Sequence, residues 1–229
     1  MAWSRPHIEK EARRLQYEIW THRDLLFEFG VPPLPQLFSP EIAARVCDIS
    51  YEFMDGIPSR DGSAGFDAAG TFDRGRNQIL ISHRFAPEVR RFTGAHEIGH
   101  YVLHPQLGFN VAHRDRPVGH HGGQSRAPME READYFAACF LAPAKVVIQE
   151  FEKRFGKPPL VLDENLAFHL AHKQARLLLT AGPQSLEFAT ALAAAQSLDG
   201  RHFPSMAQTF GISVQAMAIR IYELGLTSH

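Results

Sequence analysis

Three histidines in the segment RRFTGAHEIGHYVLHP, residues 90–105, follow one another at intervals of four: His96, His100 and His104. On a helix this spacing puts their side chains on one face. The first two belong to HEIGH, which matches HExxH. In that pattern two histidines one turn apart bind zinc, and the glutamate between them, here Glu97, polarises a bound water. A merely polar helix face is the alternative, but most other residues of this helix are apolar, and burying an unpartnered imidazole pair is costly.

Helix geometry separates the three histidines. His96 and His100 are about 6 Å apart along the axis, a gap that their side chains can close onto one ion. His96 and His104 are about 12 Å apart, whereas two nitrogens on one zinc are at most roughly 4 Å apart. His104 is therefore excluded from a site shared with His96, and we expect it to finish the helix or line its rim. No glycine follows the second histidine as in HExxHxxGxxH, so a third ligand must come from another element.

The best candidate for the third ligand is in EREADYFAACFLAP, residues 130–143. Glu130 and Asp134 are four residues apart and face the same way on a helix. We expect Glu130 to bind the metal and Asp134 to accept a hydrogen bond from a ligand histidine, which fixes that histidine's tautomer. Glu132 points about 200° away around the helix and is the weaker alternative. The acids could instead form a solvated helix start, which the helix dipole favours, but the upstream HExxH argues against this.

Three protein ligands would leave the fourth zinc position to water, as in catalytic rather than structural sites. Zinc lowers the pKa of its water, and Glu97 could take a proton from that water and return it to the leaving amine of a peptide. The developing oxyanion needs a second electrophile. Candidates for oxyanion or substrate contacts are Tyr101, His113, Arg114, His120 and His121. The loop histidines could equally form a second metal site or a polar surface.

The elements before the HEIGH helix are predicted from periodicity and breakers. Residues 7–29 predict an amphipathic helix. SPE at residues 39–41 predicts the start of a second helix, which would run through Ile49. NQILIS, residues 77–82, predicts a strand that pairs with part of GFDAAGTF across a turn. This strand could bind an extended substrate if it lies at the edge of its sheet.

Prolines bound the elements that follow. Pro87 would open the HEIGH helix and Pro105 would close it. Residues 105–128 are rich in glycine, proline and histidine without periodicity, which predicts a loop of functional length. Pro128 or Met129 would begin the helix that carries the acids. Further helices are predicted at residues 146–155 and 165–198, followed by a helix pair near the C-terminus.

The C-terminal pair, in SMAQTFGISVQAMAIRIYELG, has the spacing of a DNA-binding helix-turn-helix. Its second helix, however, carries only Arg220 as a base, opposed by Glu223. Because phosphate contacts dominate affinity for DNA, we favour a structural role over DNA binding. The residues expected to pack onto the core are Ile212, Met217, Ile221 and Leu224.

Composition narrows the function classes. The chain has 229 residues and a formal net charge of −1, so no global field attracts nucleic acid, membranes or acidic substrates. Cys47 and Cys139 are too few for a disulfide framework, which favours a reducing, cytoplasmic setting. The N-terminal residues lack the apolar stretch of a signal peptide, and no apolar run is long enough to span a membrane.

RRFTGAHEIGHYVLH followed by EREADYFAACFLAP is similar to the paired signature of the ImmA/IrrE family of zinc metallopeptidases. The resemblance extends upstream through GTFDRGRNQILIS and downstream through the helix pair ending in LGL, from roughly Ile8 to Leu226. The linking loop, with HRDRP and GHHGG, does not share in it. The resemblance implies that His96, His100 and Glu130 match the family's ligands and Glu97 its catalytic glutamate.

The resemblance also implies an α+β, mostly helical fold of the gluzincin type, with a small β-sheet beside the HExxH helix. The expected activity is zinc-dependent cleavage of a helix-turn-helix repressor that silences stress-response or mobile-element genes. The alternatives are a regulatory or toxin-like module that binds a partner or DNA without proteolysis, and a closed structural zinc site. The predicted parts are an N-terminal helix and linker (1–36), a metallopeptidase core (37–164) and a helical region with the helix-turn-helix-like pair packed on that core (165–229).

Overall fold

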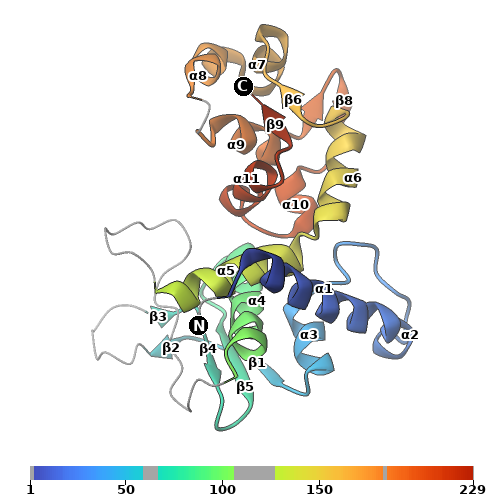
Figure 1. Ribbon diagram of the computed structural model, residues 1–229, viewed down its shortest axis with the longest axis vertical. Coiled ribbons are helices and arrows are strands. Elements are labelled where there is room, and N and C mark those ends of the chain that lie inside the picture. The colour runs from blue at the N-terminus through green and yellow to red at the C-terminus, as the bar shows by residue number, and fades with distance from the viewer. Residues whose placement is uncertain (1–2, 59–66, 106–126, 183–184, 229) are drawn as a thin grey trace. The chain divides into compact units, whose positions relative to one another are not determined.

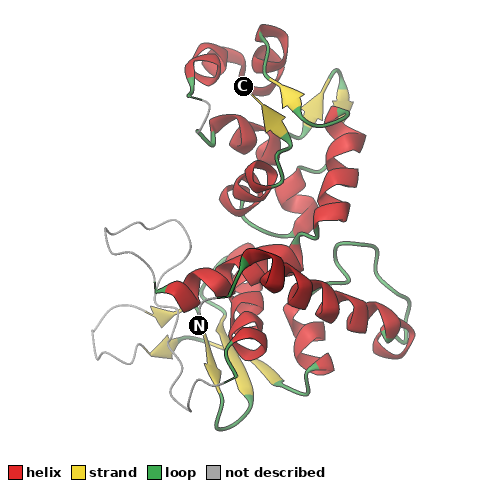
Figure 2. Ribbon diagram, viewed as in Figure 1, coloured by secondary structure: helices red, strands yellow, loops and turns green. Residues whose placement is uncertain are grey.

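The computed structural model describes residues 3–58, 67–105, 127–182 and 185–228 (Figure 1). Its helices and short strands (Figure 2) divide into two units, Met1–Leu141 and Ala142–His229. Helices predominate and the strands are few and short, so the predicted α+β class is confirmed. The three-part division at residues 36 and 164 stays a prediction.

Unit 1 combines a small sheet with the helices that carry the HEIGH segment and the acidic segment. Its helices are α1 (Arg5–Thr21), α2 (Arg23–Leu26), α3 (Pro40–Val46), α4 (Pro87–Leu103) and α5 (Pro128–Leu141). Its strands are β1 (Ser50–Met54), β2 (Ile57–Pro58), β3 (Asp67–Ala68), β4 (Gly70–Asp73) and β5 (Gln78–Ser82). Prolines open α4 and α5 because the first helical turn needs no backbone N–H donor there.

The main sheet has the order β1-β5-β4. β4 runs antiparallel to β5 and β1 runs parallel to it, so Ile79 lies opposite both Phe72 and Tyr51. The hypothesis that β5 binds a substrate at its edge is therefore wrong, because both of its edges are already paired. The apolar run ILI, with Ile79 and Ile81 fully buried, is what a central strand needs. Among the described strands, β1 and β4 form the two edges of this sheet.

β1 replaces part of a predicted helix. The Ser39 hydroxyl accepts a hydrogen bond from the Ile42 backbone N–H at 3.3 Å and caps α3, as the sequence predicts. The helix nevertheless ends at Val46 rather than running through Ile49. Asp48 adopts a φ of 55°, which turns the chain into β1. The strand exists because a distant partner, β5, supplies its hydrogen bonds, and periodicity along one segment does not reveal such a partner.

α4 occupies the centre of unit 1. It packs against β4 and β5 on one side and against α5 and α3 on others, while α1 packs along α5. The Gln16 side chain of α1 donates to the Cys139 and Phe140 carbonyls, each at 2.9 Å, and so ties α1 to the end of α5. Phe136, Phe140, Ile98 and Leu103 are fully buried in this unit. The core therefore holds α4 and α5 side by side.

Unit 2 consists of helices connected by short strand pairs. Its helices are α6 (Ala144–Phe155), α7 (Glu164–Ala171), α8 (Ala175–Thr180), α9 (Glu187–Ala194), α10 (Met206–Phe210) and α11 (Val214–Glu223), with a 3-10 turn at His172–Gln174. The paired strands are β6 (Leu160–Val161) with β9 (Thr227–Ser228), and β7 (Ser197–Leu198) with β8 (Arg201–His202). The predicted helical region 165–198 is thus broken into shorter helices.

α10 and α11 form the predicted helix pair, joined by Gly211 at a φ of 62°. Both pack against α9 within unit 2. Ile212, Met217 and Ile221 are buried, whereas Leu224 is half-buried. Their packing onto the metallopeptidase core stays a prediction.

Arg220, the base that α11 would need to bind DNA, is instead buried in unit 2. Arg220 is only 3% exposed, and its Nε donates to the Ala142 carbonyl at 3.1 Å. A guanidinium held in this way does not reach a phosphate, which supports a structural role for α11. None of the helices in the described part of the chain is long and apolar enough to cross a membrane.

Candidate metal centre

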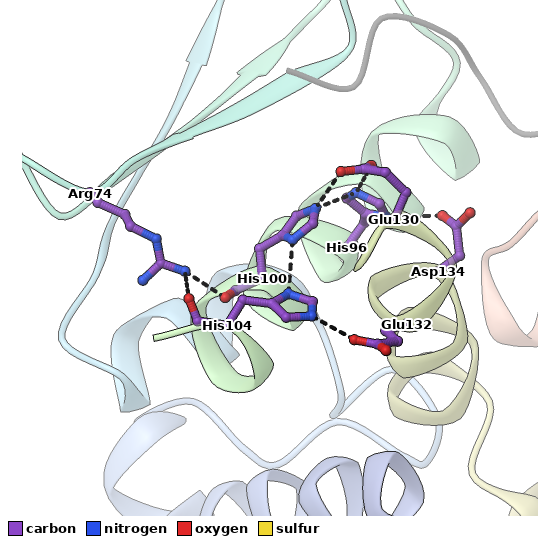
Figure 3. A network of polar contacts seen from close by, with 7 residues as sticks. All are labelled: Arg74, His96, His100, His104, Glu130, Glu132 and Asp134. Carbon is purple, nitrogen blue, oxygen red and sulfur yellow. Dashed lines mark hydrogen bonds and ion pairs between the residues drawn. The ribbon is translucent and has the colours of Figure 1, made fainter. Parts of the chain in front are cut away.

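The metal-ligating candidates meet at the contact between α4 and α5 (Figure 3). His96 and His100 lie one turn apart on α4 and are each 1% exposed. Gly99 permits the approach of α5. A Cβ at this position would lie 3.1 Å from Cδ1 of Phe136 and 3.2 Å from the Ala133 backbone. The small residue therefore lets the first turn of α5 bring its acids against the two imidazoles.

Glu130 faces both histidines. Its Oε2 lies 3.2 Å from Nε2 of His96 and its Oε1 lies 3.3 Å from Nε2 of His100. The two Nε2 atoms are 3.0 Å apart. In a tetrahedral zinc site with bonds near 2.0–2.1 Å, the ligand atoms are separated by about 3.3 Å. These three side chains can therefore hold one metal ion with two nitrogens and one carboxylate.

The charge on Glu130 suits this arrangement. Burial by itself raises the pKa of Glu130, but hydrogen bonds and positive charge from His100 and His96 outweigh it and hold the pKa well below its usual range. Glu130 is therefore a carboxylate at neutral pH. A negative ligand beside two imidazoles attracts a divalent cation, which supports the fit of the site.

Asp134 lies one turn after Glu130 on α5 and faces the other nitrogen of His96. Its Oδ1 is 2.9 Å from Nδ1 of His96. A carboxylate only accepts hydrogen bonds, so Nδ1 donates and the lone pair is left on Nε2. This is the tautomer that a metal ligand at Nε2 requires.

Glu97 is completely buried on α4, directly after His96. Tyr51 of β1 lies on the same side of this helix. Burial raises the pKa of Tyr51, and the negative charges of Glu41 and Glu97 add to the increase. A Cβ at Gly94 would clash with the Tyr51 hydroxyl, so this glycine admits the tyrosine. Sequence reasoning missed Tyr51 because β1 itself was not predicted.

The other candidates for substrate contacts are divided between described and undescribed parts of the chain. The Tyr101 ring lies edge-on to Phe72 of β4, with centroids 5.8 Å apart. The Tyr101 side chain therefore extends from α4 toward β4, an edge strand of the sheet. His113, Arg114, His120 and His121 fall outside the described residues.

His104 ends α4, as expected, and its contact with Glu132 is a feature that the sequence did not indicate. As the C-cap of α4 it is only 1% exposed, so it does not line a solvent-facing rim. Its Nδ1 lies 3.2 Å from Nδ1 of His100, and its Nε2 lies 2.8 Å from Oε2 of Glu132. Burial lowers the pKa of His104, although the hydrogen bond to Glu132 opposes this. Glu132 thus contacts His104, while Glu130 is the acid beside His96 and His100.

The site lies within a segment of the chain that is similar to known proteins. Residues 62–160 match the family model of the IrrE N-terminal-like domain. The chain is 32% identical to the radiation response metalloprotease IrrE of Deinococcus radiodurans, over 57% of this chain and 44% of that protein. It is 30% identical to the radiation response metalloprotease IrrE of Deinococcus deserti, over 53% of this chain and 47% of that protein. The match spans less than half of each relative. Residues 62–160 of this chain are therefore similar to the IrrE N-terminal-like domain, and the relatives that the chain matches in part are metalloproteases by name.

Proposed function

We propose that this protein is a zinc-dependent endopeptidase. His96, His100 and Glu130 would hold the ion, and Glu97 would act as general base. The observation that carries the proposal is the approach of two imidazole nitrogens and the two oxygens of one carboxylate to 3.0–3.3 Å within an IrrE-like segment. Two imidazole nitrogens and one glutamate are a ligand set of catalytic zinc, and three protein ligands leave a position for water.

The protein's own residues divide the remaining work. A zinc ion held by His96, His100 and Glu130 would supply a water of lowered pKa and would polarise a peptide carbonyl. Glu97 accepts a proton from the attacking water and delivers it to the leaving amine. Complete burial of Glu97 keeps its carboxylate away from bulk solvent, where competing water would weaken its interaction with the reacting groups.

The substrate proposed is an extended segment of a cytoplasmic helix-turn-helix repressor that silences stress-response or mobile-element genes. The resemblance to the ImmA/IrrE family supports this class, and the relatives' name, radiation response metalloprotease, supports a stress response. β4 is an edge of the described sheet and packs against α4. A substrate strand added along β4 would therefore run beside the HEIGH helix.

The test is co-expression with the helix-turn-helix protein encoded nearest to this one, followed by mass analysis of the fragments. Glu97→Gln should lower cleavage by about 10²- to 10⁴-fold, because a general base contributes on this scale. Its zinc content should stay that of the wild type. Glu164→Gln, at an exposed glutamate of α7, is the matched control and should cleave normally. Undiminished cleavage by Glu97→Gln would sink the proposal.

A further inference from the structure

A second chain of polar contacts leads away from the candidate metal centre. It runs from His100 through His104 to Glu132, whose side chain points away from that of Glu130 (Figure 3). His104 and Glu132 are 1% and 7% exposed. Water therefore does not compete for these hydrogen bonds, and each buried polar atom must find its partner within the protein.

The donor and acceptor roles in this chain follow from the chemistry of imidazole. A neutral imidazole has one N–H donor and one acceptor nitrogen. A metal at Nε2 of His100 takes that atom's lone pair, so Nδ1 of His100 carries the proton and donates to Nδ1 of His104. His104 must then carry its own proton on Nε2, where the Glu132 carboxylate accepts it. Only one arrangement of protons satisfies all three residues and the metal.

We propose that His104 and Glu132 are positioning residues for the metal ligand His100. This inference rests on the metal site of the proposed function. The hydrogen-bonded chain holds His100 in its Nδ1–H tautomer, so that Nε2 presents a lone pair beside His96 and Glu130. Asp134 does the same for His96 by direct contact. The two ligand histidines are thus oriented by acids of the same helix, one directly and one through an inserted imidazole.

Two other segments, which contain Trp3 and Arg74, hold the residues of this hydrogen-bond network in place. The second oxygen of Glu132 accepts the Trp3 backbone N–H at 2.8 Å, and the Trp3 indole N–H donates to the Leu103 carbonyl at 2.7 Å. The Arg74 guanidinium donates to the His100 and His104 carbonyls at 2.6 and 2.8 Å. A cation at the carbonyl end of α4 complements the helix dipole. These contacts fix the backbone of His104 and the carboxylate of Glu132.

The competing explanation is that His104 and Glu132 only stabilise the end of α4. In that case removing His104 would lower the stability of the fold but leave the folded protein's zinc affinity and the tautomer of His100 unchanged. The positioning role predicts a change in both properties. Loss of a hydrogen-bond partner behind a metal ligand typically weakens metal affinity by about ten- to hundredfold.

A pair of similarly sized substitutions tests this distinction. His104→Leu removes the acceptor for His100, whereas the carbonyl oxygen of His104→Asn can still accept its N–H. Competition with a chromophoric chelator should show about ten- to hundredfold weaker Zn²⁺ binding for His104→Leu and a smaller loss for His104→Asn. Glu132→Gln, which removes the negative acceptor but keeps its shape, should also weaken binding. His202→Leu, at an exposed histidine of β8, should bind like the wild type.

A second measurement needs no metal and no substrate. Imidazole ¹⁵N shifts of the metal-free wild type should report His100 as the Nδ1–H tautomer, and those of His104→Leu should report the Nε2–H form or a mixture. Circular dichroism establishes that each variant is folded, and Glu132→Gln carries the test if His104→Leu does not fold. Wild-type affinity together with an unchanged His100 tautomer would overturn the positioning role. If the wild type bound no Zn²⁺, the proposed function would fall, while the tautomer would still decide this inference.

Discussion

Unit 1 and unit 2 each bury charged residues between helices, but they use them differently. In unit 2, Arg154 is 7% exposed and donates to the Pro204 and Glu150 carbonyls and to the Thr209 hydroxyl. Arg220 donates to the Ala142 carbonyl. Each guanidinium thus satisfies backbone or hydroxyl acceptors and pairs with a carboxylate of its own helix, Glu150 for Arg154 and Glu223 for Arg220, which is the usual role of a buried polar group in a fold.

In unit 1, His96, His100 and Glu130 direct their ligand atoms at one another instead. Three acceptor groups that converge within 3.0–3.3 Å leave a place that only a proton or a cation can fill. Both units bury polar side chains, and they therefore differ in where the polar atoms of these side chains point. Buried polar groups that end on the backbone indicate structure, whereas those that converge on a shared point indicate a site.

The largest expected effect is on the converging group. Glu130→Gln removes the negative ligand, so the variant should lose more Zn²⁺ affinity than the about ten- to hundredfold typical for an outer hydrogen-bond partner. Peptide cleavage should fall with it, and chelator competition together with metal analysis measures the loss. Glu132→Gln is the comparison on the same helix, with a smaller expected effect. Equal losses for both variants would contradict the distinct positions of the two acids.

A smaller effect is expected where the buried charge ends on the backbone. Arg220→Met should lower the free energy of unfolding of unit 2 by about 1–3 kcal/mol, because the Ala142 carbonyl loses its partner in a buried place. Urea denaturation followed by circular dichroism measures the change. Zn²⁺ affinity of the folded variant should equal that of the wild type. Tight DNA binding by the wild type in an electrophoretic shift at low salt would contradict the structural role of Arg220.

The smallest effect concerns the pH dependence of unit 2. Burial by itself raises the pKa of Glu150, but hydrogen bonds and charge from Arg154 and Lys153 outweigh it and lower the pKa. A carboxyl whose pKa is lower in the folded state contributes stability above its unfolded pKa, near 4.3, and this contribution is lost as pH falls below that value. Glu150→Gln should therefore be less stable than the wild type at pH 7, and the difference should shrink toward pH 3. Thermal melts at several pH values measure it, and a constant difference would exclude the charge as its cause.

The sequence located the segments of the site well, because their signals are local. Proline at the first turn predicted the starts of α4 and α5, and the apolar run ILI predicted β5. β1 and the central position of β5 were not predicted, since strand pairing joins residues that are far apart in the chain. Tyr51 was missed for the same reason.

The sequence determined which side chains could converge. It did so through the residue types in HEIGH and in the segment with Glu130 and Asp134, and through their spacing along two helices. Spacing on a helix is a local property, so the exclusion of His104 from a site shared with His96 needed no tertiary information. Only the tertiary structure decided what His104 does instead, because its partner Glu132 comes from another helix and the Gly99 contact sets how closely that helix approaches. The pairing of two elements depends on packing between them, which no single segment of the sequence contains.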